Sequence, residues 1–366
     1  MRINQGPDKT ILFLVLILVV FGFLIFSSAA FGLLTRSSAS LSSVLFNQFA
    51  LGLGGGVVLG FLLYLVPVQT LRKYSIYAFG LFAVLTLLVF IPNIGFSYNG
   101  AARWIHFGGF SLQPSEPLKL AFILFFASWL TAFQDKLDSF KRGFLPTIGI
   151  LAIPAILLIL QPDNGTMLTF LAAGMGMLVA AGTKWKHIGV LALAGIILFG
   201  VLITVKPYAL DRVKTFLDPS SDPYGSSYQI RQSLVAIGSG QVTGRGFGQS
   251  LQKFELLPEP IGDSIFAVLG EEFGFLGAGA LILIFLVFGM RGLVLSGRLA
   301  DPFARLATVG IVIIILAQAY LNIGAMLGVF PLTGVPLPFV SHGGTALLVA
   351  LAEIGVLLKL SRYAKE

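Results

Sequence analysis

Asp263 is the residue of this 366-residue chain whose type and position favour chemistry most clearly. It ends a long polar stretch and opens an apolar segment at residues 264–290. A carboxylate in that place is commonly a helix N-cap, which accepts hydrogen bonds from backbone N–H groups and stays ionised beside the helix dipole. It could equally act as a general base or bind a metal ion. The two interpretations are compatible, and the residues alone do not decide between them.

Other charged residues fall inside apolar segments or at their edges, where an ion costs roughly 2.5–3.5 kcal/mol at mid-membrane. They are Glu116, Lys119, Asp163, Glu271, Glu272 and Glu353. Glu116 and Lys119 are three residues apart and are expected to pair on one helix face. Glu353 needs a partner in mid-segment, and Lys119 is one candidate. Each of these charges is either part of a structural pair or part of a site.

The polar stretches between apolar segments also carry cations: Arg103, Arg212, Lys214, Arg231 and Arg245. Such side chains are solvated, bind lipid headgroups or hold a diphosphate. Arg103 precedes Trp104, and the pair also fits an anchor at the membrane interface. The glycine run at 238–248 lacks the spacing and preceding strand of a nucleotide-binding loop, so we expect turns there.

The elements that must position these residues are membrane helices. The chain is 56% hydrophobic and only 11% charged, whereas soluble domains carry about 25% charged residues. The apolar segments, ten in all, are 11–34, 44–67, 75–92, 117–133, 145–160, 166–181, 187–205, 264–290, 306–330 and 343–360. Most approach the roughly 20 residues that cross a bilayer. The predicted fold is an all-α polytopic membrane protein, a single transmembrane domain over 1–366 with about ten spans.

Two features of composition limit the chemistry. The chain has no cysteine, which excludes disulfides and thiolate sites, and its three histidines are too far apart in sequence to favour a zinc site. Most of the 24 Lys and Arg residues fall in connections on one side of the membrane. By the positive-inside rule both termini are then cytoplasmic. The net charge of +8 is therefore a topology signal and predicts no nucleic-acid partner.

The longest polar stretch, 206–262, becomes an extracytoplasmic loop between spans seven and eight. Ile230, Leu234 and Ile237 within it have helical spacing and predict a short amphipathic helix over 226–237 at the membrane interface. Ordered loops of this length usually carry function.

The order of short motifs along the chain resembles that of the SEDS family (shape, elongation, division and sporulation proteins). The motifs are GAARWI (100–105), LQPSE (112–116) with Lys119, QPDNGT (161–166), QKFE (252–255), LPE (257–259), Asp263, IFAVLGEE (265–272) and PLPFVSHGG (336–344). The likeness covers nearly the whole chain. The QKF run is more similar to the division (FtsW-like) branch, whereas GVPLP at 334–338 fits the elongation (RodA-like) branch as well.

This resemblance implies an inverting peptidoglycan glycosyltransferase of the bacterial cytoplasmic (inner) membrane. Family members polymerise lipid II, a disaccharide-pentapeptide on undecaprenyl diphosphate, into an undecaprenyl-linked glycan chain at the outer face. They work with a class B penicillin-binding protein, a transpeptidase, and with other divisome or elongasome membrane proteins. The essential carboxylate of the family falls on Asp263.

The resemblance also implies supporting roles. Candidates for binding the substrate diphosphate are Arg103, Lys119, Arg212 and Arg245. Further candidate site residues are Trp104, Glu116, Asp163, Glu255, Glu259, Glu272, Ser341 and His342. A divalent cation, Mg²⁺ or Mn²⁺, fits the abundance of oxygen ligands near Asp263, but no ligand set can be derived.

The chain departs from the family beside its key residue. Ile261 and Gly262 stand where His-Thr is usual, Ser264 where Phe is usual, and His342 where Tyr is usual. Rival interpretations are a lipid II flippase or transporter, an O-antigen-ligase-like glycosyltransferase that also uses a lipid-linked donor, and a scaffold of the division machinery.

Overall fold

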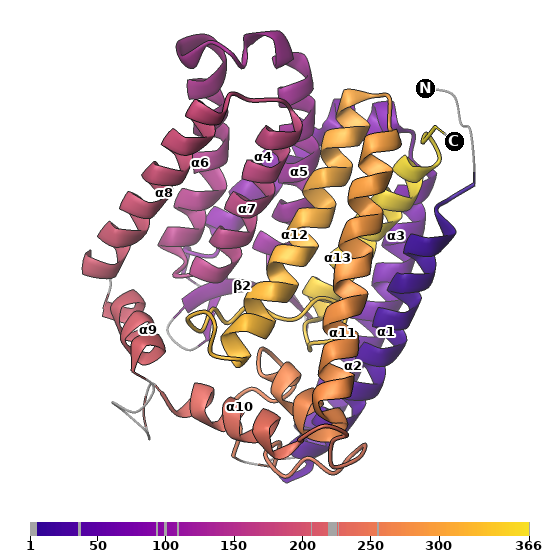
Figure 1. Ribbon diagram of the computed structural model, residues 1–366, viewed down its shortest axis with the longest axis vertical. Helices are drawn as coiled ribbons and strands as arrows, with labels where there is room; N and C mark the ends of the chain where they lie inside the picture. Colours follow the sequence, from indigo (N-terminus) through magenta and orange to yellow (C-terminus); the bar gives the residue numbers. More distant parts are fainter. Residues whose placement is uncertain are drawn as a thin grey trace.

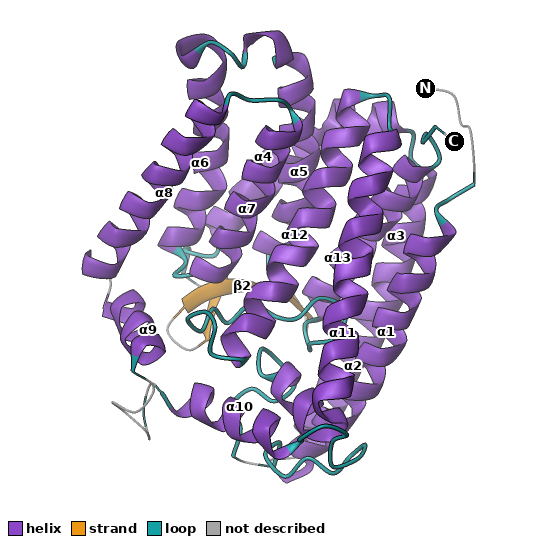
Figure 2. Cartoon of the chain, viewed as in Figure 1, coloured by secondary structure: helices purple, strands orange, loops and turns teal. Residues whose placement is uncertain are grey.

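A computed structural model shows a bundle of long helices, with a small sheet and several loops gathered at one end, the lower end in Figure 1. The structure describes residues 6–35, 38–92, 94–98, 101–107, 110–205, 207–218, 225, 227–254 and 256–365. Most of these residues lie in helices (Figure 2). We call the end that carries the strands the sheet end.

The long helices coincide with the predicted apolar segments. They are α1 (Lys9–Ala30), α4 (Val68–Leu88), α5 (Ser115–Ala132), α6 (Leu145–Leu160), α7 (Asn164–Ala180), α8 (Trp185–Val205), α11 (Ile265–Arg298), α12 (Pro302–Met326) and α13 (Gly344–Ser361). The segment predicted at 44–67 is composite and consists of α2 (Ser38–Phe46), a wide helical turn (Asn47–Gly55) and α3 (Gly56–Leu65). Among the described residues, 8 helical stretches are long and apolar enough to cross a membrane, and α7 is a shorter apolar helix. The all-α polytopic class is confirmed, and the count of ten crossings stays a prediction.

Helix α12 lies at the centre and packs against α5, α7, α11 and α13. Aromatic side chains fill the space beside it: Phe122 lies 5.1 Å from Phe126 and 5.3 Å from Phe170, measured between ring centroids. Large apolar side chains also cover the outside of the bundle, such as Phe13, Phe61 and Ile196. A surface of this kind is stable against lipid and not against water.

The sheet end contains three short antiparallel strands, β1 (Gly95–Tyr98), β2 (Ala101–Phe107) and β3 (Phe110–Leu112), in the order β1-β2-β3. Ile105 in the middle strand is opposite Gly95 on one side and Leu112 on the other. No strands were predicted here from the sequence. The sheet matters because it presents Arg103 toward the connection between α6 and α7.

The same end carries α9 (Pro207–Leu217) and α10 (Tyr228–Ser239). Helix α10 confirms that a short helix lies in this stretch, with bounds Tyr228–Ser239. Its buried face consists of Ile230, Ser233 and Ala236, so the expected apolar face is wrong at Leu234, which is exposed. The glycine run after it forms turns, as predicted.

Helix α11 is broken at Gly274, whose φ of 63° and ψ of −162° are not helical. The turns that follow α10 bond to the break. The N–H groups of Phe275 and Leu276 donate to the carbonyls of Gln241 and Val242, at 2.8 and 3.1 Å. Two carbonyls of α11 before the break are also paired. Glu271 O accepts from the N–H of Arg245, and Glu272 O accepts from the N–H of Gly246, both at 3.0 Å. The backbone groups that a broken helix would leave bare in lipid are thus paired.

At the opposite end, Asp8 connects three helices. Its carboxylate accepts from the N–H groups of Thr10 and Ile11 at the start of α1 and pairs with Arg291 of α11 at 2.8 Å. Its own N–H donates to Ser361 of α13 at 2.9 Å. The first helix therefore begins, and the last ends, at the same end of the bundle, in keeping with termini on one side of a membrane.

Candidate active site

Asp263 lies at the sheet end, in a tight turn directly before α11. The carbonyl of Glu259 accepts from the N–H groups of Gly262 (3.0 Å) and Ser264 (3.2 Å), which closes the turn. The N-cap of α11 is Ser264, one residue later, and Asp263 Oδ1 is buried without a hydrogen-bond partner among the described residues. The interpretation of Asp263 as an N-cap is therefore wrong, because Ser264 holds the N-cap position of α11 and makes no side-chain cap hydrogen bond.

The surroundings of Asp263 favour its protonated form more than usual. The pKa of Asp263 is raised from 3.8 to about 6. Burial is the largest cause and the nearby charge of Glu259 the second, and hydrogen bonds from Gln229 and the Asp263 backbone and the charge of Arg212 act in the opposite direction. The expectation that the helix dipole keeps this group ionised depended on the N-cap position, which Ser264 holds; with a pKa of about 6, Asp263 is nevertheless mainly ionised at pH 7. A carboxyl group with a pKa near the working pH is suited to proton transfer.

Two parts of the chain hold the Asp263 turn in place. One is α12, and the other is the connection between α12 and α13, residues 327–343. Asn322 is buried and its amide donates to both Asp263 O and Val335 O, at 2.8 Å each. Ser341 donates to Gly262 O at 2.7 Å, and the N–H of His342 donates to Ile261 O. The atypical residues Ile261 and Gly262 thus take part through backbone carbonyls, which any residue type could supply.

His342 contributes its ring to packing. It stacks on Phe26 of α1 with centroids 5.9 Å apart, and burial lowers the pKa of His342 to about 4. Its imidazole is therefore neutral near pH 7. We conclude that it does not supply a cation to the site.

A second polar group, from α5, connects to the same segment through α12. Lys119 pairs with Glu116 at 2.8 Å and donates to Gln318 Oε1 at 2.7 Å, as the spacing of the first two residues predicted. The Gln318 amide in turn donates to Pro336 O at 2.9 Å. Gln318 and Asn322 are one helical turn apart on α12, so they connect the Lys119 pair to the Asp263 turn through residues 335 and 336.

Glu353 of α13 lies beside this pair. It is 3% exposed, within electrostatic range of Lys119 and Glu116, and its Oε1 has no hydrogen-bond partner among the described residues. Lys119 is thus its neighbour, as the sequence suggested, but the direct ion pair of Lys119 is with Glu116.

Arg103 and Asp163 form a third group, at the start of α7. The guanidinium donates to the carbonyls of Gln161 and Pro162 and lies 4.0 Å from the Asp163 carboxylate. Trp104 follows it on β2 and is half-buried. Gly165 packs this turn onto the α12–α13 connection, since a Cβ there would lie 2.2 Å from the Val335 side chain.

Arg212 of α9 reaches the connection from the other side. Its guanidinium donates to the carbonyl of Leu332, and Arg212 is among the charges that act on Asp263. Arg212 and Asp263 are therefore brought together, as expected for two members of one site.

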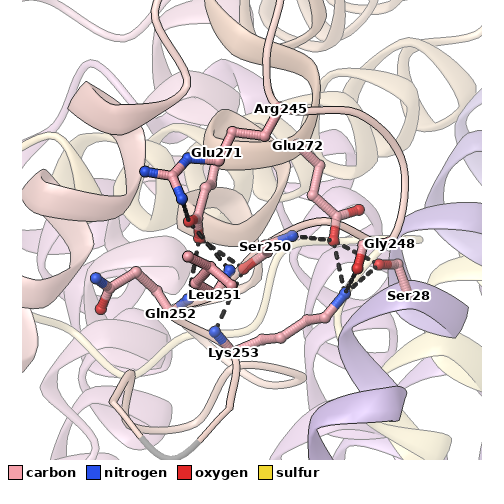
Figure 3. Close-up of polar contacts among 9 residues, drawn as sticks. All are labelled: Ser28, Arg245, Gly248, Ser250, Leu251, Gln252, Lys253, Glu271 and Glu272. Atoms are coloured by element: carbon pink, nitrogen blue, oxygen red, sulfur yellow. Dashed lines mark hydrogen bonds and ion pairs between the residues drawn. The ribbon is translucent and has the colours of Figure 1, made fainter.

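Arg245 and Glu272 belong to a separate network around α11 (Figure 3). Lys253 is fully buried and bonds to Glu272 (2.8 Å), Ser28 (2.9 Å) and the carbonyl of Gly248. Glu271 pairs with Arg245 at 3.6 Å and accepts from Ser250 Oγ at 2.6 Å. The predicted need of the two glutamates for partners is confirmed, and the structure places Arg245 with Glu271 and not with Asp263.

Several residues at the site were not singled out from the sequence: Gln229, Gln318, Asn322 and Gly334. Two of them had a signal, since Gln318 and Asn322 are polar residues four apart in the apolar segment 306–330. Gly334 had none, because its importance depends on where the chain places it. Glu255 lies outside the described residues.

Oxygen atoms suitable for a cation are few at this site. Within the described part of the chain, no group of three or more His, Asp or Glu side chains is placed to hold a metal ion. Asp263 and Glu259 are the neighbouring carboxylates, with Glu259 Oε2 close to Gly262. Any cation here would depend on these two groups and on oxygens from a ligand.

These features define a multi-pass membrane protein with a polar site at one end of an apolar bundle. The chain belongs to the FtsW/RodA/SpoVE family of cell cycle proteins, whose family model matches residues 8–366.

Individual relatives agree over their whole length. Stage V sporulation protein E of Bacillus subtilis is 38% identical over 362 residues, which cover 99% of each chain. A protein named "Probable peptidoglycan glycosyltransferase FtsW" from a Geobacter species is 38% identical over 99% of this chain and 98% of its own.

Two solved structures share the fold. One is described as "Structural coordination of polymerization and crosslinking by a peptidoglycan synthase complex"; its matching chain has a TM-score of 0.79 and 28% identity, with 98% of each chain covered. The rod shape determining protein RodA of Thermus thermophilus has a TM-score of 0.72 and 25% identity over 99% of each chain.

Proposed function

We propose that this chain is a peptidoglycan glycosyltransferase that polymerises lipid II into glycan strands. The observation that carries the proposal is Asp263: a carboxyl group with a pKa of about 6, held by backbone contacts and within electrostatic range of Arg212. The name of the full-length relative from Geobacter supports the activity.

The reaction follows from these groups. Asp263 accepts the proton of a sugar hydroxyl on the incoming lipid II, and the hydroxyl oxygen forms a bond to the anomeric carbon of the growing chain. The bond from that carbon to undecaprenyl diphosphate breaks, and the diphosphate leaves with the electron pair. Attack opposite to the leaving group inverts the anomeric configuration.

The departing diphosphate needs cations, and the lipid tails need an apolar path. Arg103 is 15% exposed beside the Asp163 turn, so it is the better placed of the predicted donors, whereas Lys119 is buried in its own pair. An apolar cavity of about 450 Å³ between α3, α4, α5 and α13 is lined by residues such as Leu63, Leu124 and Leu348. Its chemistry suits an isoprenoid chain.

The reaction takes place at the outer face of the bacterial inner membrane, with the sheet end outside. A class B penicillin-binding protein then crosslinks the product, and other divisome or elongasome proteins accompany the pair. The likeness to a chain of a peptidoglycan synthase complex supports such a partner. The full-length relative named FtsW, at 38% identity, favours the division branch, which the QKF run also resembles more closely.

A divalent cation, Mg²⁺ or Mn²⁺, would be held by Asp263 and Glu259 together with substrate oxygens. The unpaired Asp263 Oδ1 and the repulsion between the two carboxylates fit such an ion. When bound, it supplies Lewis-acid stabilisation of the developing negative charge.

The test compares the wild type with Asp263→Ala in purified form, with lipid II as substrate. We expect Asp263→Ala to melt like the wild type and to bind lipid II, but to lose polymer formation by at least about 100-fold, the usual contribution of a general base. Full polymerisation by this variant would contradict the assignment. A translocation assay in liposomes, run in parallel, identifies a flippase by transport without polymer.

A further inference from the structure

Gly334 occupies an unusual place in the α12–α13 connection. Its φ is +67°, and a Cβ built on it would lie 3.7 Å from Asp263 Oδ2 and 3.7 Å from Arg212 Nη2. Within the described residues, no other heavy atom outside its chain neighbours lies within 4 Å of that point. The space over Gly334 is therefore bounded by one carboxylate oxygen and one guanidinium nitrogen.

Both walls of this space are fixed by the same segment. Arg212 Nη1 donates to the carbonyl of Leu332, two residues before Gly334. Asp263 is tied through its carbonyl to Asn322, which also holds Val335, the residue after Gly334. The separation of the carboxylate and the guanidinium is thus set by residues 332–335.

The charges of the Asp263 carboxylate and the Arg212 guanidinium determine which chemical group of a substrate can bind between them. A phosphate would be attracted by Arg212 but repelled by the Asp263 carboxylate at similar range. A sugar carbon that bears a hydroxyl satisfies both, because the O–H donates to the carboxylate and a neighbouring sugar oxygen accepts from the guanidinium. Arg212 then belongs to the acceptor sugar, and the diphosphate lies elsewhere.

We propose that the space over Gly334 is the subsite for the acceptor hydroxyl, with Arg212 as a ligand of the acceptor sugar and Gly334 required because a side chain there fills the subsite. This inference rests on the proposed glycosyl transfer and assigns its acceptor side.

A matched pair of glycines allows a direct test. Gly328 lies in the same connection with a φ of +70°, and a Cβ there would meet Ile230 and Leu234 only at ordinary distances of 3.8 Å or more. Gly334→Ala and Gly328→Ala therefore share the backbone strain, and only the first enters the space beside Asp263. The full-length protein is assayed with a preformed lipid-linked glycan oligomer as donor and lipid II as the varied acceptor.

We expect similar melting temperatures for the two variants, but a loss of about 100-fold in kcat/KM for the acceptor in Gly334→Ala alone, as a group displaced by about 1 Å produces. Arg212→Ala should raise the KM for acceptor lipid II and leave the KM for the donor oligomer unchanged. The Arg212→Ala measurement tests the inference independently, even if Gly334→Ala does not fold.

Equal activity of Gly334→Ala and Gly328→Ala would overturn the inference, and so would an Arg212→Ala variant that raises only the donor KM. The absence of polymer with the wild type would instead contradict the proposed function, so the two failures are distinguishable.

Discussion

The pKa of Asp263 sets an expected pH dependence at the scale of the single residue. The base must be ionised to accept a proton, so kcat/KM should fall below a pH of about 6, the pKa that burial and Glu259 produce. His342, with a pKa of about 4, stays neutral over this limb and does not contribute to it.

Substitution of Glu259, the charged residue next to Asp263, tests which group causes the fall of kcat/KM at acid pH. Because Glu259 raises the pKa of Asp263, Glu259→Gln should move the acid limb of the kcat/KM profile to lower pH. Arg245→Gln serves as the control, since Arg245 pairs with Glu271. An acid limb that stays in place, or moves to higher pH, in Glu259→Gln would show that another group titrates.

The buried pair of Lys253 and Glu272 gives a second prediction for single residues. Both side chains are fully buried, so Lys253→Met leaves an unpaired carboxylate and should lower the free energy of unfolding by about 3–5 kcal/mol. The double variant Lys253→Met/Glu272→Gln should regain most of that loss, because no buried charge remains. Thermal unfolding in detergent measures both.

Arg245→Met is the control for this pair. Arg245 itself is exposed, and Glu271 keeps its hydrogen bonds from Ser250 Oγ and the N–H groups of Leu251 and Gln252, so the loss should be only about 0–1 kcal/mol. If the single and double variants of Lys253 lose the same amount, the ion pair is not the source of the effect.

At the scale of elements, the contact between the α10–α11 turns and the break in α11 depends on a close backbone approach. Gly244 has a φ of +80°, and a Cβ on it would lie 2.2 Å from the carbonyl of Glu272. Gly248 also has a φ of +80°, with no atom within 4 Å of its Cβ position. The two glycines thus differ in their neighbours and not in their backbone conformation.

We therefore expect Gly248→Ala to cost about 1 kcal/mol of stability from backbone strain. Gly244→Ala should cost about 1–3 kcal/mol more, because the turn must move away from α11. Melting temperatures of the two variants provide the comparison. Equal losses would mean that the turns do not support the helix break.

At the scale of the whole molecule, residues 327–343 are where separate parts of the chain meet. Contacts to this segment come from α7 through Gly165, from α9 through Arg212, from α12 through Gln318 and Asn322, and from the wide turn before α3 through Gln48. A change in any of these elements is transmitted to the turn that carries Asp263.

Two of these contacts should act as one unit. Asn322 and Ser341 hold adjacent carbonyls of the Asp263 turn, so the losses in kcat from Asn322→Ala and Ser341→Ala should be less than additive in the double variant. Asn322→Ala combined with Arg291→Ala, at the other end of the bundle, should be additive. Additivity in the first pair would refute a shared positioning role.

The positions of the long helices could be predicted from the sequence, because an apolar segment of about 20 residues can form few structures in lipid. It also predicted the pairing of Glu116 with Lys119, which is confirmed, whereas the catalytic role of Asp263 came from the family resemblance and stays a prediction. It did not identify the three strands, which form from short polar segments with weak patterns, nor the break at Gly274. Asn322 and Gly334 could not be assigned their places, because these depend on contacts between residues distant in the chain.

The paired break in α11 has a consequence for how the protein is made. The turns that satisfy the break, at residues 241–246, precede the helix in the chain and so leave the ribosome first. If they are already folded against the membrane when α11 enters, the exposed carbonyls and N–H groups of the helix find partners at once. Assembly of this region then has a fixed order, with the turns in place before the helix that depends on them.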